Sequence, residues 1–152
     1  MLEILENALK QGYLLHGSSH LINGRLDPNW AKDDYAELGT MAIYATNILA
    51  VAVFRAVIRG DSIRWGYAWR EGSLALHAEN VLPEDHEHVL NTSVELGKGY
   101  VYILPRDSYK PSGDDPSEYA SHTPVQPIQT IEVTPEELYE LQKEIGFIVD
   151  LH

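Results

Sequence analysis

Three side chains that can take part in chemistry stand in short apolar segments typical of β-strands. They are His16 in residues 14–18, Tyr44 in residues 43–46 and Glu118 in residues 117–121. Each stands at the edge of its segment, where it can face a cleft. Gly17 lacks a Cβ, which lets a ligand approach the backbone closely. The segments therefore predict a cleft lined by an imidazole, a phenol and a carboxylate.

Histidine, tyrosine and glutamate in this chain order resemble the H-Y-E signature of ADP-ribosyltransferases of the diphtheria-toxin-like and poly-ADP-ribose-polymerase-like type. The similar stretches are residues 13–58 and 100–133, and residues 118–127 are similar to the family's carboxylate strand and the proline after it. The resemblance implies an α+β fold, with split antiparallel β-sheets around a central NAD cleft and a few flanking helices. Residues 59–99 have no counterpart in it.

The resemblance makes Glu118, His16 and Tyr44 the expected catalytic residues. Cleavage of the bond between nicotinamide and ribose builds oxocarbenium character on the ribose, so an ionised carboxylate stabilises the transition state more than the ground state. Glu118 is expected to supply this carboxylate. By the resemblance it also hydrogen-bonds a ribose hydroxyl and orients the acceptor.

The same resemblance implies a set of NAD-binding residues. Tyr44 offers an aromatic surface for the nicotinamide ring, where stacking contributes on the order of 1 kcal/mol, and the backbone of Gly17 fits the nicotinamide amide. His16 is expected to hydrogen-bond the adenosine ribose, and Ser18 to assist at the nicotinamide amide. Phe54, ten residues after Tyr44, is expected to form the other side of the nicotinamide site.

The implied function is transfer of a single ADP-ribose unit from NAD to a macromolecular acceptor, protein or nucleic acid, as in a toxin, effector or defence component with an antitoxin or immunity partner. Arginine-directed relatives carry a second glutamate two residues before the catalytic one, where this chain has Pro116. Two alternatives stay open. One is a non-catalytic NAD-binding, ADP-ribose-binding or acidic protein-interaction module on the same fold. The other, an NAD-dependent RNA 2′-phosphotransferase, is less favoured because the sequence shows no cluster of arginines near His16.

The composition of the chain is compatible with an ADP-ribosyltransferase and disfavours some other classes of protein. The 152 residues, 44% of them hydrophobic, suffice for a single domain over residues 1–152. A net charge of −12 disfavours nonspecific attraction to nucleic-acid phosphates. A local basic cleft for an anionic dinucleotide is still compatible with five arginines in the first half: Arg25, Arg55, Arg59, Arg64 and Arg70.

The lack of cysteine excludes disulfides, thiolate zinc sites and a cysteine nucleophile, and favours a cytoplasmic location. The longest apolar run, residues 48–57, is far shorter than the roughly 20 residues of a membrane span, so we expect no membrane association.

Other constellations have simpler explanations. His86 and His88 stand among acids and, with His77, could ligate a metal, but a solvated acidic loop explains them better, so no metal site is expected. Alternating Trp65, Tyr67 and Trp69 fit either an acceptor-binding surface or one face of a packed sheet. His122 could act as a general base near Glu118, but an ordinary role is favoured for it as well.

Periodicity and capping residues predict the elements that position these side chains. Helices are expected at residues 2–11, at residues 48–58 and from Thr134 to Gly146. Strands are expected at residues 13–15, 41–45, 99–104, 118–122 and 128–133, with a hairpin over residues 62–77 that turns at Gly72. The acidic residues 79–95 are expected to be irregular.

Overall fold

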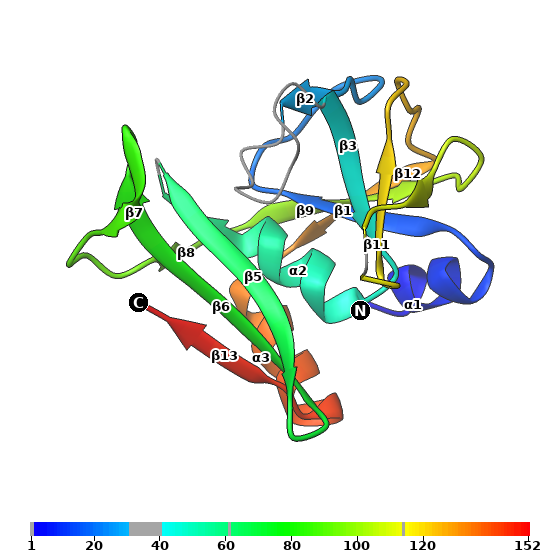
Figure 1. The fold of residues 1–152 in the computed structure, drawn as a ribbon. Helices are drawn as coiled ribbons and strands as arrows, with labels where there is room; N and C mark the ends of the chain where they lie inside the picture. Colours follow the sequence, from blue (N-terminus) through cyan, green and yellow to red (C-terminus); the bar gives the residue numbers. More distant parts are fainter. Residues whose placement is uncertain (1, 31–40, 61, 114) are drawn as a thin grey trace.

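The computed structural model describes residues 2–30, 41–60, 62–113 and 115–152 (Figure 1). Its described residues form three helices and mostly antiparallel sheets, so the expected α+β class is confirmed. The helices are α1 (Glu3–Lys10), α2 (Leu49–Val57) and α3 (Pro135–Ile145). The strands are β1 (Leu14–Ser18), β2 (Asn29–Trp30), β3 (Met41–Thr46), β4 (Ile58–Arg59), β5 (Ile63–Arg70), β6 (Ser73–Leu82), β7 (Asp85–Val89), β8 (Glu95–Leu96), β9 (Gly99–Leu104), β10 (Lys110–Pro111), β11 (Glu118–Ser121), β12 (Gln129–Val133) and β13 (Ile148–Leu151).

Most strands belong to two sheets. The larger sheet has the order β10-β11-β3-β1-β9-β12, with β2 beside β3, and all its pairings are antiparallel. The smaller sheet has the order β13-β6-β5, with β7 also paired to β6. Strand β13 runs parallel to β6, whereas β5 and β7 run antiparallel to it. Strands that are far apart in the sequence thus meet in each sheet.

Helix α2 lies between the two sheets and contributes more buried residues to their shared core than any other element (Figure 1). Every residue of this helix except Arg55 is buried. It packs on β1 and β9 of the larger sheet and on α3, and its Phe54 ring lies 6.5 Å from the Trp65 ring of β5. A helix that is apolar on nearly all sides is expected in such a buried position.

Two glycines let α2 lie directly on the larger sheet. A Cβ placed on Gly17 would stand 2.1 Å from the carbonyl oxygen of Ala52, and one placed on Gly99 would stand 1.8 Å from that of Ala56. These distances are far below van der Waals contact, and the colliding atoms belong to the helix backbone. The space that the missing Cβ of Gly17 leaves is therefore filled by the backbone of α2, which gives this glycine a packing role.

The C-terminal helix begins and ends as its sequence predicts. Thr134 caps α3 and forms a capping box with Glu137, Pro135 follows at the first helical position, and Gly146 ends the helix with a left-handed backbone at φ 69°. Each feature satisfies or terminates backbone hydrogen bonding at a helix end.

None of the helices in the described part of the chain has the length and apolar character that crossing a membrane requires.

The prediction of irregular structure over residues 79–95 is wrong. Strand β6 continues to Leu82, β7 pairs back on it, and β8 pairs with β4. Strand β7 reads Asp85–Val89 and is exposed along most of its length. Its charged side chains are typical of an edge strand that does not pair further.

Candidate functional site

The structure brings the strands of His16, Tyr44 and Glu118 side by side. They are β1, β3 and β11, neighbours in the order β11-β3-β1 (Figure 1). Glu118 of β11 is registered opposite Thr46 of β3, and Thr46 is also registered opposite Leu15 of β1. Residues that are 102 positions apart in the chain (118 − 16) therefore reach one part of one sheet.

Tyr44 and Glu118 lie on the same face of this sheet. Glu118 is opposite Thr46, and Tyr44 stands two residues before Thr46, opposite Ala120. Because side chains alternate between faces, Tyr44, Thr46 and Glu118 share a face. Tyr44 and Glu118 are diagonal neighbours, a relation in which residues stand about 7–8 Å apart. Both side chains are partly buried.

His16 occupies the place where β1 and β3 stop pairing. The described residues of β1 and β3 form a single residue pair, Leu15 with Thr46, whereas β1 forms five pairs with β9. Beyond the Leu15–Thr46 pair, Nδ1 of His16 donates a hydrogen bond of 2.6 Å to the carbonyl oxygen of Tyr44. The imidazole thus supplies a bond that a regular ladder would make through the backbone. It holds the two strands together without closing the sheet between them.

The imidazole is held neutral with a defined tautomer. Burial is the main cause that lowers the pKa of His16, and the positive charge of Arg55 lowers it further, against the opposing effect of the bond to Tyr44. The carbonyl of Tyr44 can only accept, so the proton of neutral His16 is assigned to Nδ1. Nε2 then carries a lone pair that can accept a hydrogen bond from a hydroxyl group.

The loop after β1 is fastened beside His16. The hydroxyl of Tyr102, which is opposite His16 on β9, donates to the carbonyl of His20 at 2.9 Å and accepts from the amide of Ile22 at 2.6 Å. Ser18 accepts from the amide of His20 at 3.1 Å, so its hydroxyl has a structural role in the loop. The guanidinium of Arg59 adds a 3.0 Å bond to the carbonyl of Ser19.

A hydrogen-bonded cluster fixes the start of the Glu118 strand. The hydroxyl of Tyr67 on β5 donates to Asp115 and lies 2.9 Å from Oγ of Ser117. Asp115 also accepts from the backbone amide of Ser117 at 2.9 Å. Burial alone would raise the pKa of Asp115, but the bonds from Ser117 and Tyr67 hold it below its usual range.

Tyr67 connects the unassigned segment 59–99 to the residues just before Glu118, through its bonds to Asp115 and Ser117. Burial and the bond to Asp115 raise the pKa of Tyr67, and the negative charge of Glu118 contributes in the same direction. The alternation of residues 63–69 predicted the strand, but it could not show which of its side chains bonds these residues.

Phe54 lies away from any surface that a ligand can reach. Its side chain is 0% exposed and belongs to the core between the sheets. We therefore leave Phe54 out of the candidate site. Its neighbour Arg55 is the one residue of α2 that is not fully buried, and its charge contributes to the lowered pKa of His16.

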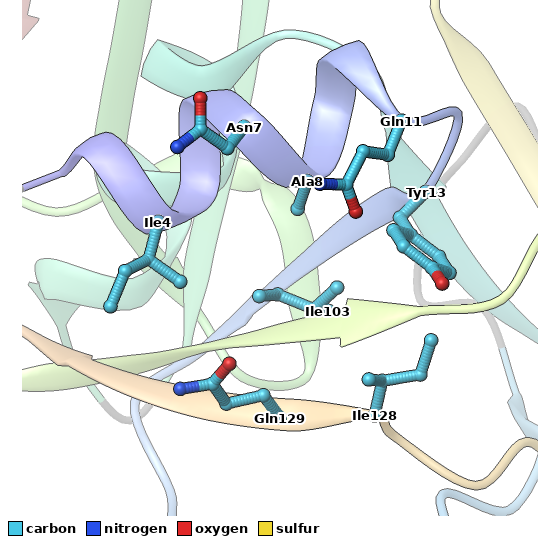
Figure 2. Close-up of a pocket in the computed structure, with 8 residues that line it drawn as sticks. All are labelled: Ile4, Asn7, Ala8, Gln11, Tyr13, Ile103, Ile128 and Gln129. Atoms are coloured by element: carbon cyan, nitrogen blue, oxygen red, sulfur yellow. The ribbon is translucent and has the colours of Figure 1, made fainter.

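Two hollows of the described residues lie away from these three strands. One, a groove of about 300 Å³ shown in Figure 2, lies between α1 and the edge formed by β9 and β12. It is lined by Ile4, Asn7, Ala8, Gln11, Tyr13, Ile103, Ile128 and Gln129. The other hollow is acidic and lies between α1 and α3. His16, Tyr44 and Glu118 line neither of these two hollows.

No cluster of three or more His, Asp or Glu side chains that could hold a metal ion occurs within residues 2–30, 41–60, 62–113 and 115–152. His77, His86 and His88 therefore form no such cluster with the acids around them.

Comparisons of the chain with protein-family models, with curated proteins and with solved structures find no match. The functional argument therefore depends on the residues and their geometry.

Proposed function

We propose that the protein is an NAD-dependent ADP-ribosyltransferase that uses NAD as substrate and transfers one ADP-ribose unit to a macromolecule. The observation that supports this most strongly is the meeting of β1, β3 and β11 where the first two strands part. His16 binds the backbone of Tyr44 at that point, and Glu118 shares a face with the Tyr44 side chain. Three remote segments, which carry an imidazole, a phenol and a carboxylate, thus meet in one sheet.

Each residue has a proposed role. The Glu118 carboxylate stabilises the positive charge that develops on the ribose as the bond between its C1′ and the nicotinamide nitrogen breaks. Nicotinamide leaves with the electron pair of that bond, and a nucleophilic atom of the acceptor forms the new bond to C1′ and loses its proton. Tyr44 offers its ring to the nicotinamide, and Nε2 of neutral His16 accepts from a ribose hydroxyl.

Supporting residues complete the proposed site. The backbone of Gly17 and the hydroxyl of Ser18 stand beside His16 on β1, where they can meet the nicotinamide amide. Tyr67, Asp115 and Ser117 hold the beginning of the Glu118 strand.

The lack of cysteine agrees with a cytoplasmic location.

Glu118→Gln tests the chemistry. The change removes the negative charge and keeps the size of the side chain, so we expect ADP-ribose binding to persist while NAD turnover falls at least about 100-fold, the usual loss when one transition-state stabilising group is removed. Purified protein is incubated with NAD labelled in the adenosine half and with cell lysate. Nicotinamide release is measured together with the label on protein and on nucleic acid.

Glu140→Gln is the matched control, because Glu140 is exposed on α3 and the substitution makes the same change in charge. It is expected to retain full turnover. Equal nicotinamide release by wild type and Glu118→Gln would remove Glu118 from the mechanism. A wild-type protein that binds ADP-ribose but releases no nicotinamide with any acceptor fraction would instead be a binding module.

A further inference from the structure

Arg55 carries a positive charge that no anionic group of the described residues pairs. Its side chain is partly buried in α2, and within the described part of the chain it makes no ion pair and no hydrogen bond. Transfer of an unpaired charge out of water is unfavourable, so charges in such places are normally paired. An arginine keeps its proton even where burial lowers its pKa, as burial does here.

Two arginines that follow Arg55 in the sequence have acceptors for their guanidinium groups. Arg59 donates to the carbonyl of Ser19. Arg64 forms an ion pair with Glu79 and donates to the carbonyl of His86. Arg55 lies in α2, four residues before Arg59 (59 − 55), and among the described residues it has no comparable acceptor.

The surroundings of Arg55 leave its donors available. Its Cζ atom lies 5.8 Å from the centre of the Trp65 ring, a cation–π distance. A guanidinium that rests on an aromatic face keeps its in-plane N–H groups free to form hydrogen bonds. Burial, and to a smaller extent the charge of Arg55, lower the pKa of His16, so His16 is neutral and adds no second cation.

We infer that the guanidinium of Arg55 binds a phosphate group of the ligand that His16 contacts. Under the proposed function, on which this inference rests, the phosphate is part of the diphosphate that joins the two halves of NAD. The planar N–H fork of arginine matches phosphate oxygens, and such charge-assisted bonds are the stronger ones in proteins. A bound phosphate also supplies the counter-charge that Arg55 lacks, and it offsets the negative field of a chain with net charge −12.

Arg55→Gln tests the inference by binding alone, without turnover. ADP-ribose, adenosine and inorganic pyrophosphate are titrated into wild type and variant by calorimetry at low salt. Loss of a charge-assisted contact is expected to weaken ADP-ribose about 10- to 100-fold and to abolish any pyrophosphate binding, while adenosine affinity stays the same. Arg70→Gln is the matched control, since Arg70 is exposed on β5 and is expected to change none of the three affinities.

Thermal unfolding separates a ligand-binding arginine from a structural one. Removal of an unpaired charge is expected to leave the Tm of Arg55→Gln equal to or above that of wild type, and added ADP-ribose is expected to raise the wild-type Tm more than the variant's. Arg55→Lys keeps the charge without the fork and is expected to lose ADP-ribose affinity several-fold, so it serves if Arg55→Gln does not fold.

Equal ADP-ribose affinity in wild type and Arg55→Gln would overturn the inference, as would an equal loss for adenosine. Both results are independent of the Glu118→Gln experiment, which tests NAD turnover. ADP-ribose has no nicotinamide bond to cleave, so Arg55 can prove to bind phosphate even if Glu118→Gln turns NAD over normally. Conversely, Glu118 can prove essential while Arg55 proves irrelevant.

Discussion

The two sides of strand β1 differ, although they belong to one five-residue strand. On the β9 side, β1 pairs along its whole length, from Leu14 with Leu104 to Ser18 with Tyr100. On the β3 side it pairs only at Leu15. On the paired side β1 has a complete ladder with β9, whereas on the other side its backbone separates from β3 after one residue pair. The two edges of the same strand thus differ in how far they are paired.

The residue types explain this difference. On the paired side, Gly17 and Gly99 bring α2 so close that helix and strands share one packed core. On the open side, the His16 ring reaches the Tyr44 carbonyl and keeps that group satisfied while the backbones separate. Close packing on one side therefore stabilises a strand whose other side lacks a full ladder.

The largest effect is expected on the paired side. Gly17→Ala places a methyl group against the carbonyl of Ala52, and neither backbone can move without shifting α2. Overpacking of this kind typically lowers the free energy of unfolding by 1–3 kcal/mol, and a collision between backbones should reach about 3 kcal/mol or more. Chemical denaturation of wild type and variant measures the difference.

Gly113→Ala is the control for Gly17→Ala, because a Cβ at Gly113 meets nothing within 4 Å and only its φ of 71° resists the change. We expect it to lower the stability by about 1–2 kcal/mol. Similar losses in the two variants would show that α2 does not depend on the close approach at Gly17.

On the open side, His16→Ala should affect binding more than folding. The Tyr44 carbonyl loses its donor, which should lower the stability by about 1 kcal/mol. ADP-ribose affinity should fall about tenfold, since one hydrogen bond of that order is lost with the ligand as well. His88→Ala on the exposed strand β7 should change neither quantity in the same measurements. A loss of stability without a loss of affinity would make His16 a purely structural residue.

The stability of the protein should depend on pH through His16. The pKa of folded His16 lies below its ordinary value of 6.5, so the unfolded chain binds more protons between these two values. The contribution of His16 to stability is therefore present above pH 6.5 and is lost as the pH falls toward the folded pKa, with a slope of at most about 1.4 kcal/mol per pH unit. Unfolding curves at several pH values, with those of His16→Ala subtracted, isolate this slope. An identical pH dependence in both proteins would contradict it.

The smallest effect is expected from Tyr67→Phe. The change keeps the ring and removes the hydroxyl that binds Asp115 and Ser117, so the stability should fall by about 1 kcal/mol. NAD turnover should fall several-fold because the Glu118 strand loses an anchor. Tyr139→Phe, on exposed α3, is the control and should leave turnover unchanged. Unaltered turnover in Tyr67→Phe would show that the contact between the smaller sheet and the Glu118 strand does not contribute to NAD turnover.

Local signals predicted the elements of the larger sheet and the last helix well. The predicted strand 99–104 has the bounds of β9, because it is apolar, rich in β-branched and aromatic residues, and ends at a proline. Helix α3 followed from Thr134, Pro135 and Gly146, whose effects on helix ends are local. These features act over a few residues, so the sequence alone reveals them.

Features that depend on distant packing were missed. Strand β7 has no apolar alternation, because most of it is exposed on both faces, and its pairing with β6 depends on the preceding turn. Strand β13 was not predicted because its partner β6 lies about seventy residues earlier. In α2, the sequence could not show that Phe54 is fully buried whereas Arg55 is only partly buried, since the phase of a helix that is apolar nearly all round cannot be read from its pattern.

Tyr44 and Arg55 stand on one continuous strand-to-helix stretch, fastened at its bend by Thr46, whose hydroxyl accepts from the amide of Ile48 at 3.1 Å. Their separation is therefore set by backbone geometry, and one inserted residue would turn the rest of the helix by about 100°. If both residues serve the same ligand, chains that share this chemistry should conserve the eleven-residue interval from Tyr44 to Arg55 (55 − 44). That interval offers a criterion for recognising distant relatives where whole-chain similarity fails.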